Sequence, residues 1–154
     1  MKTAPRYMLM LEDDADDRHI TQTFFKDNGY DIDIEFLTNS DELMPYLECC
    51  ENGFKDLPCM VLLDKNLPAG GGMRVLKDLK SHPVFRMIPV VMLSGTGFPH
   101  EVDEAYRQGA SSFIIKPLTY ELTIKKIQGF LHYWFDTVEF PLAVPVEIGS
   151  WSIS

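Results

Sequence analysis

Residues 59–64 read CMVLLD, a nearly continuous apolar run that ends in a carboxylate, and residues 88–94 read IPVVMLS, which ends in a hydroxyl. A strand with one face in water alternates apolar and polar residues, whereas a strand covered on both faces is apolar throughout. The two runs therefore predict strands of a parallel sheet that is covered by helices on both sides.

Three more short apolar runs flank these two, at residues 7–11, 32–37 and 112–115. The segments between the runs have helical length and carry apolar residues one turn apart: Ile20 with Phe24, Leu43 with Leu47, Val75 with Leu79, and Val102 with Tyr106. Gly29 and Gly109 stand where two of these helices are expected to end. The order predicts a strand–helix unit repeated five times, an α/β fold with right-handed crossovers.

The composition limits both size and partners. The chain has 154 residues, of which 45% are hydrophobic and 12% aromatic, enough for the core of one domain. A formal net charge of -9 argues against nonspecific binding to nucleic acid or to an anionic membrane. We find no signal peptide and no apolar stretch of membrane-spanning length. Three cysteines without metal-ligand spacing favour reduced thiols in a cytoplasmic protein.

Chemically active side chains follow four of the five runs. Glu12 and Asp13 follow the first, Asp64 the third, Ser94 the fourth and Lys116 the fifth. The carboxyl ends of parallel strands share one edge, and ligands bind there, where the strand order reverses. In the order 2-1-3-4-5 this point lies between the first and third strands, so we expect these residues to converge.

This set of side chains suits a phosphoryl group and a metal. Three carboxylates favour a hard cation, and Mg²⁺ fits because it prefers a few carboxylates together with water and phosphate oxygens. The metal would also offset the repulsion within residues 11–17, LEDDADD. A carboxylate beside such a metal can act as a nucleophile toward phosphorus, while an amine and a hydroxyl stabilise the phosphoryl oxygens.

Four motifs in this order, LEDD, LLDKNLPAGGG, PVVMLSGTG and GASSFIIKP, resemble the receiver domain of bacterial two-component response regulators over residues 5–136. The resemblance implies a flavodoxin-like three-layer (βα)5 sandwich with sheet order 2-1-3-4-5. It also implies a phosphoprotein that is not otherwise an enzyme, since it catalyses only its own phosphorylation and dephosphorylation. We expect a receiver domain at residues 5–138, then an irregular tail at residues 139–154 and no output domain.

The resemblance also assigns roles. Asp64 is the expected phospho-acceptor, and Glu12, Asp13, Asp64 and the backbone carbonyl of Asn66 are the expected Mg²⁺ ligands. Ser94 matches the switch hydroxyl, Lys116 the invariant lysine and Phe113 the rotating aromatic of the family. The Lys116–Pro117 bond corresponds to one that is usually cis, so a cis peptide is expected there. Residues 68–72 read PAGGG where the family usually has PGMDG, and Gly72 keeps the closing glycine.

A narrower resemblance concerns partners. The opening LEDDADDR, the loop GFKDLP and the ending IQGFLHYWFDTVEFP are similar to stand-alone receivers of the cyanobacterial phytochrome type. It implies a sensor histidine kinase, phytochrome-like, as phosphoryl donor and a downstream protein partner that the sequence does not identify.

Other interpretations remain open. One is a receiver-like binding module that is not phosphorylated. Such a module would not need the acids, the hydroxyl and the lysine, all of which this chain carries. A phosphatase of the haloacid dehalogenase type would need an acid two residues after its nucleophile, where this chain has Asn66. Asp14, Asp16 and Asp17 are interpreted as first-turn acids that favour the helix dipole.

The last helix is apolar on nearly every side near its end. Six residues step by four and three and predict a stripe that faces the core: Tyr120, Ile124, Ile127, Leu131, Trp134 and Val138. Phe130, Tyr133 and Phe135 extend the apolar surface beyond that stripe. Either the tail folds back over this surface or a second chain covers it as a homodimer.

Overall fold

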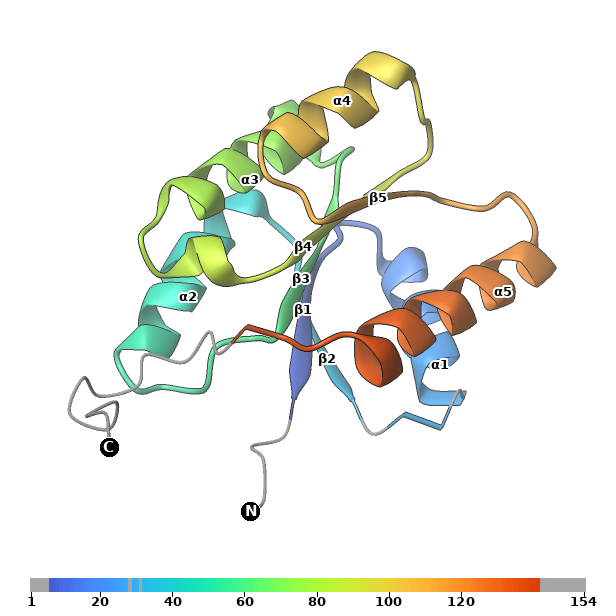
Figure 1. Ribbon diagram of the computed structural model, residues 1–154, viewed down its shortest axis with the longest axis horizontal. Coiled ribbons are helices and arrows are strands. Elements are labelled where there is room, and N and C mark those ends of the chain that lie inside the picture. The colour runs from blue at the N-terminus through green and yellow to red at the C-terminus, as the bar shows by residue number, and fades with distance from the viewer. Residues whose placement is uncertain (1–5, 28, 31, 142–154) are drawn as a thin grey trace.

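Five parallel strands form the middle layer, in the order β2-β1-β3-β4-β5. The computed structural model describes residues 6–27, 29–30 and 32–141, and Figure 1 shows the sheet nearly edge-on. The strands are β1 (Tyr7–Leu11), β2 (Asp33–Leu37), β3 (Met60–Asp64), β4 (Val90–Ser94) and β5 (Ser112–Ile115). The predicted fold class and strand order are confirmed.

Within the described residues, five α-helices connect and follow the strands. They are α1 (Ala15–Asp27), α2 (Leu43–Glu51), α3 (Gly71–Ser81), α4 (Pro99–Arg107) and α5 (Tyr120–Leu131). A π-helical segment at His132–Thr137 continues α5, and short 3-10 turns lie at Ser40–Glu42, Pro68–Gly70 and Phe85–Met87. Within the part of the chain that the structure describes, no helix has the length and apolarity needed to cross a membrane.

The side chains of each strand alternate between two cores. Leu9 and Leu11 of β1 face the side covered by α2, α3 and α4, where Leu47 and Leu76 are fully buried. Met8 and Met10 face the side covered by α1 and α5 in Figure 1, with Phe25 and Leu131. The continuous apolar runs are therefore explained, because both faces of the inner strands are covered.

The polar residues that were expected just beyond two strands are the last residues of those strands. Asp64 ends β3, and Ser94 ends β4. The ladder continues past both, because Lys65 N–H donates to the Leu93 carbonyl at 2.8 Å and Lys116 N–H donates to the Ser94 carbonyl at 2.7 Å. Backbone hydrogen bonds thus hold both residues in place.

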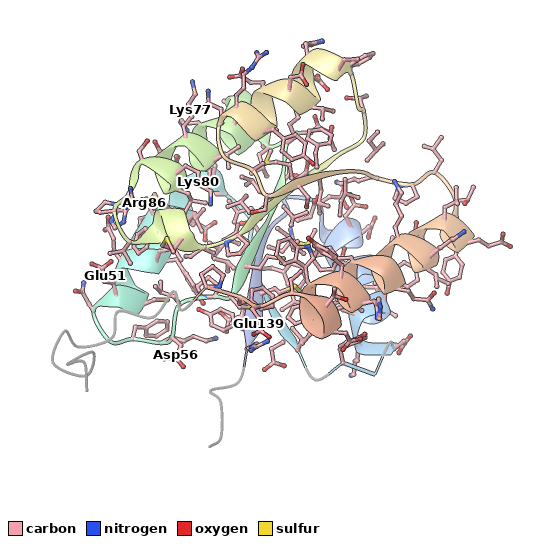
Figure 2. The ribbon with its side chains drawn as sticks, viewed as in Figure 1. Glu51, Asp56, Lys77, Lys80, Arg86 and Glu139 are labelled. Carbon is pink, nitrogen blue, oxygen red and sulfur yellow. The ribbon has the colours of Figure 1, made fainter. Side chains whose placement is uncertain are left out.

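Lys80 of α3 anchors the entry to β4. Its Nζ donates to the backbone carbonyls of Arg86 at 2.9 Å and Ile88 at 2.8 Å, and Figure 2 labels Lys80 and Arg86 side by side. Gly109, with φ of +103°, ends the α4 turn against the same side chain, and a Cβ there would lie 2.8 Å from Lys80 Cγ. The predicted helix stop at Gly109 is confirmed, with this close contact as a second reason for glycine.

The predicted core stripe of the last helix is correct at its centre and wrong at its start. Leu131 is fully buried, but Tyr120 is 68% exposed. Thr119 caps α5, since its Oγ1 accepts from the Leu122 N–H at 3.2 Å, so Tyr120 lies in the first turn. Its ring packs on Phe24 of α1, at 5.2 Å between centroids, instead of on the sheet.

Part of the apolar end of this helix is covered by the chain itself. Phe140 packs on Trp134 and Phe135 with ring centroids 5.8 and 5.3 Å apart. The Arg6 guanidinium lies 5.3 Å from the centre of the Phe140 ring. Residues 138–141 have no regular secondary structure, and residues 142–154 of the expected tail lie outside the described part.

The three free thiols differ in accessibility, and their reactivity should follow. Cys49 is exposed and Cys50 buried, and burial raises the pKa of the Cys59 thiol to about 11 and raises that of Cys50. A raised pKa lowers the thiolate fraction at neutral pH, and the thiolate is the nucleophile. We expect iodoacetamide at pH 7.5 to label Cys49 first, as measured by peptide mass spectrometry. Faster labelling of Cys59 in the folded protein would contradict this expectation.

Candidate functional site

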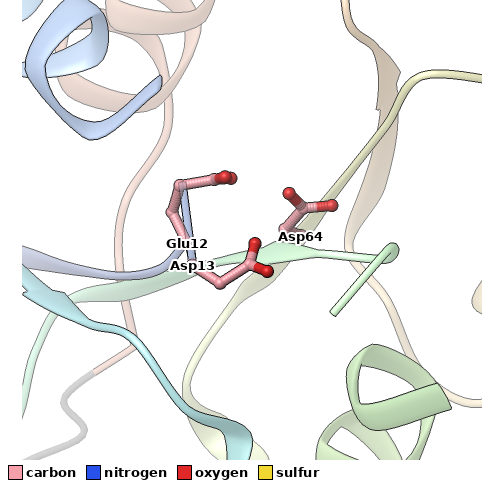
Figure 3. Close-up of side chains that lie close together, drawn as sticks. All are labelled: Glu12, Asp13 and Asp64. Carbon is pink, nitrogen blue, oxygen red and sulfur yellow. The ribbon is translucent and has the colours of Figure 1, made fainter. Parts of the chain in front are cut away.

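Three carboxyl groups meet at the carboxyl edge of the sheet. Glu12 and Asp13 follow β1, and Asp64 ends the neighbouring β3 (Figure 3). Leu11 pairs with Leu63, so Glu12 and Asp64 occupy the next positions of adjacent strands. One oxygen from each of the three groups lies within 4.8 Å of the others. This donor set fits a hard divalent cation.

Burial sets the charge of the two inner acids. Glu12 is 1% exposed and Asp64 3% exposed. Burial, followed by the hydrogen bond and charge of Asp64, raises the pKa of Glu12 to about 8. Burial alone would also raise the pKa of Asp64, but hydrogen bonds from Glu12, Lys116 and the Asn66 N–H lower it. Burial and the charge of Asp64 thus favour the protonated form of Glu12, whereas the Lys116 ammonium and the Asn66 N–H favour the ionised form of Asp64.

Lys116 supplies the positive charge at this site. Its Nζ lies 2.9 Å from Asp64 Oδ2, 3.4 Å from Glu12 Oε2 and 3.8 Å from Asp17 Oδ2. Burial alone would lower the pKa of Lys116, but these carboxylates raise it, so the ammonium keeps its charge. The opposite charges explain how the acids can crowd at the end of β1.

Ser94 lies one strand beyond Asp64. Asp64 pairs with Leu93, so Ser94 is the next residue of β4, and it is fully buried. Its Oγ accepts a hydrogen bond from the Thr96 N–H at 3.2 Å, which leaves the hydroxyl hydrogen free to donate elsewhere. Phe113 on β5 is half-buried and packs against the core on the α2–α4 side.

The backbone after β3 completes the site. The Asn66 N–H donates to Asp64 Oδ1 at 2.8 Å and so orients the carboxylate. The Asn66 N–H thus binds one oxygen of Asp64, and Lys116 Nζ binds the other. The sequence model of the response regulator receiver domain family matches residues 8–128 of the chain.

The chain belongs to the response regulator receiver family. Among curated relatives, the "Probable methanogenesis regulatory protein FilR2" of Methanothrix harundinacea is 32% identical over 130 residues, which cover 84% of each protein. The response regulator Rcp1 of Synechocystis is 29% identical over 142 residues, which cover 90% of this chain and 95% of Rcp1.

Two solved structures support the same grouping. The Mn²⁺-bound form of Rcp1 superimposes with a TM-score of 0.79 at 28% identity, covering 89% of this chain and 99% of Rcp1. The phosphorylated cyanobacterial phytochrome response regulator RcpA has a TM-score of 0.79 at 26% identity, covering 90% of this receiver and 99% of RcpA.

The prediction of a cis peptide bond between Lys116 and Pro117 is wrong. The described chain contains no cis peptide bond, so the Lys116–Pro117 bond is trans. The trans isomer is the lower-energy one for most bonds before proline. Lys116 reaches Asp64 with this geometry because its backbone N–H is already fixed to the Ser94 carbonyl.

The interpretation of the first-turn acids is correct for Asp16 and Asp17, whereas Asp14 lies just before α1. Asp14 Oδ1 accepts from the Asp17 N–H at 2.9 Å and so caps α1. Asp17 also lies 3.8 Å from Lys116 Nζ, which the spacing of residues along the chain did not indicate. The two groups meet because α1 follows β1 and Lys116 follows β5, at the same edge of the sheet.

Two further charged residues beside the site were missed. Lys65, which directly follows Asp64, forms an ion pair with Glu101 in the first turn of α4. The hydrogen bond from Lys65 is the main reason why the pKa of Glu101 is lowered. No sequence motif signals this pair, because 36 positions separate its members in the chain.

Proposed function

We propose that this receiver accepts a phosphoryl group from a sensor histidine kinase on Asp64, in a Mg²⁺-dependent reaction, and signals through protein contacts that depend on phosphorylation. The observation that carries this proposal is the environment of Asp64. Its carboxylate is ionised and buried, with Lys116 Nζ at 2.9 Å and Glu12 and Asp13 within metal-ligand reach.

The proposed ligands of the metal are the carboxylates of Glu12, Asp13 and Asp64 and the backbone carbonyl of Asn66. Mg²⁺ suits this set because it prefers a few carboxylates together with water and phosphate oxygens. Rcp1, a relative of this chain, was solved in a Mn²⁺-bound form. When bound, the cation would offset charge on the acids and on the phosphoryl oxygens.

In the transfer itself, an Asp64 carboxylate oxygen attacks the phosphorus of a phosphohistidine. The bond between the imidazole nitrogen and phosphorus breaks, an oxygen–phosphorus bond forms, and the released imidazole takes up a proton. Lys116 would offset the charge on the equatorial oxygens, and the Ser94 hydroxyl would donate to one of them. The hydroxyl can do so while its oxygen still accepts from Thr96.

The proposed readout is a shift between two conformations. Movement of Ser94 toward the phosphoryl group would leave space for Phe113 to turn inward and would reshape the face formed by α4, β5 and α5. Such a shift needs only contacts that differ between the two states. NMR spectra of the protein with beryllofluoride and Mg²⁺ should differ from those of the free protein at these elements.

The proposed donor is a phytochrome-like sensor kinase in the cytoplasm, in line with the similarity to RcpA, a cyanobacterial phytochrome response regulator. The downstream partner is a protein not yet identified. We assign residues 5–138 to the receiver domain and residues 139–154 to its tail. A homodimer through the last helix and tail is part of the proposal, and light scattering after size exclusion would test it.

Incubation with acetyl phosphate and Mg²⁺ tests the function. We expect intact-mass measurement to show a single phosphoryl adduct that does not form when EDTA removes the metal. Absence of an adduct with Mg²⁺ present would instead favour the unphosphorylated binding module. Repeated turnover of a phosphate ester would favour the phosphatase.

A further inference from the structure

Glu101 connects the two loops that border the phosphorylation site. Its Oε1 lies 3.0 Å from Lys65 Nζ, in the loop that follows Asp64. Its Oε2 accepts a hydrogen bond from the Thr96 hydroxyl at 3.0 Å, in the loop that follows Ser94. One carboxylate in the first turn of α4 therefore holds a side chain from each loop.

The ion pair is sheltered from solvent. The side chains of Lys65 and Glu101 are 18% and 20% exposed. The pair of Arg74 and Asp41 at the surface has exposures of 53% and 78% by comparison. Sheltered charges are screened less by salt and water, so their interaction responds more strongly to a new charge nearby.

Lys65 is well placed to respond to such a charge. It is the residue after Asp64, and its backbone N–H is fixed to the Leu93 carbonyl at 2.8 Å. The two loops approach closely here, since the distance from a Cβ on Gly95 to Asn66 Nδ2 in the other loop would be only 4.0 Å. The ammonium group of Lys65 is nevertheless held by α4, and Asp64 is paired with Lys116 instead.

We propose that Glu101 is a positioning residue that holds the Lys65 ammonium on α4 in the unphosphorylated receiver and releases it toward the phosphoryl group when Asp64 is modified. This inference rests on the proposed phosphorylation of Asp64. Lys65 is then a second cation for the phosphoryl group, beside Lys116. The first turn of α4 is the element released from its contact with Lys65.

The physical reason is competition for one cation. A phosphoryl group on Asp64 adds negative charge next to Lys65 and competes with the single charge of Glu101. Binding free energies are linked, so a phosphoryl group that competes with Glu101 for Lys65 is bound more tightly when Glu101 loses its charge and Lys65 is kept. Loss of Glu101 and loss of Lys65 should therefore have opposite effects on binding of the phosphoryl group.

A titration with beryllofluoride in the presence of Mg²⁺, followed by the ¹⁹F NMR signal of the bound form, tests this. We expect Glu101→Gln to lower the half-saturating concentration roughly fivefold and Lys65→Gln to raise it by a similar factor, at the lower end of usual site–site coupling. Gln at position 101 can still accept from Thr96, so the variant removes mainly the charge.

Two controls keep the result specific. Glu104→Gln makes the same charge change on α4, but Glu104 bonds only to Gln108 on its own helix among the interactions seen here, so the titration should match the wild type. Lys65→Arg keeps the charge and should recover most of the affinity that Lys65→Gln loses. In the metal-free protein, thermal unfolding of the single and double variants at positions 65 and 101 should be non-additive.

Several outcomes would overturn the inference. Shifts of Glu101→Gln and Lys65→Gln in the same direction would show a structural role in the loops only. Equal half-saturation in all variants, or additive effects on thermal unfolding, would show that the pair does not act on the site. A wild-type protein that binds no beryllofluoride would refute the proposed function instead, which keeps the two failures distinct.

Discussion

Asp64→Asn is expected to abolish the phosphoryl adduct completely. The amide oxygen of asparagine is not a nucleophile toward phosphorus, so the bond to phosphorus cannot form. The side chain keeps its shape and can still accept the Asn66 N–H, and Lys116 keeps Glu12 as a partner. Because the fold should survive, intact-mass measurement after acetyl phosphate and Mg²⁺ reports on chemistry and not on unfolding.

Asp14→Asn is the matched control for this variant. Asp14 is exposed and caps α1 through the Asp17 N–H, and asparagine is an equally good capping residue. The control should form the adduct as the wild type does. A phosphoryl adduct on Asp64→Asn, located by peptide mass spectrometry at another acid, would show that Asp64 is not the acceptor.

Gly72→Ala is expected to destabilise the protein by roughly 2–3 kcal/mol, near the top of the usual range for overpacking. A Cβ at this position would lie 2.6 Å from the Asp64 carbonyl oxygen and 2.8 Å from Lys65 Cα. Both are backbone atoms, so neither can rotate away as a flexible side chain would. The start of α3 must then move away from β3, or the end of β3 must move with Asp64.

Urea unfolding monitored by circular dichroism would measure this change. Gly129→Ala is the control, because a Cβ there would meet nothing within 4 Å and the residue lies inside α5. Alanine has the higher helix propensity, so the control should be more stable by up to about 1 kcal/mol. A Gly72→Ala protein as stable as the wild type would mean that α3 does not pack this closely on β3.

Gly72 is the most tightly packed glycine of the loop, because a Cβ there would meet backbone atoms, whereas a Cβ on Gly71 would meet the Ser40 side chain at 2.7 Å. Residues 68–72 were expected to differ from the usual family loop, and in the structure Ala69 and Gly70 have φ values of +58° and +66°. Alanine in this region is strained, whereas Gly72 needs glycine for space. Backbone conformation thus constrains positions 69 and 70, and lack of space constrains position 72.

The residues of the site could be located from the sequence because their positions follow from sheet geometry. Continuous apolar runs mark buried parallel strands, and parallel strands place their carboxyl ends along one edge. Asp64, Ser94 and Lys116 each stand at such an end, so their convergence with Glu12 follows without knowledge of any side-chain conformation. The strand order and the two-sided burial are confirmed on this basis.

The errors concern features that local sequence does not determine. Tyr120 has the correct spacing for the core stripe, but α5 begins with it and places it on Phe24. The bond before Pro117 was assigned as cis from the family pattern, although the chain reaches the site with a trans bond. The position of the Tyr120 ring and the isomer of the bond before Pro117 both depend on where a helix or loop lies relative to the sheet.

The class of fold, the edge that carries the chemistry and the acids that meet there follow from the order of apolar runs and helical segments along the chain, because that order implies parallel strands that end at one edge. Which charges pair could be learned only from the packed molecule. Lys116 with Asp17, and Lys65 with Glu101, are contacts between elements far apart in the chain. Their distances depend on how helices pack on the sheet, and side-chain volume in the two cores sets that packing.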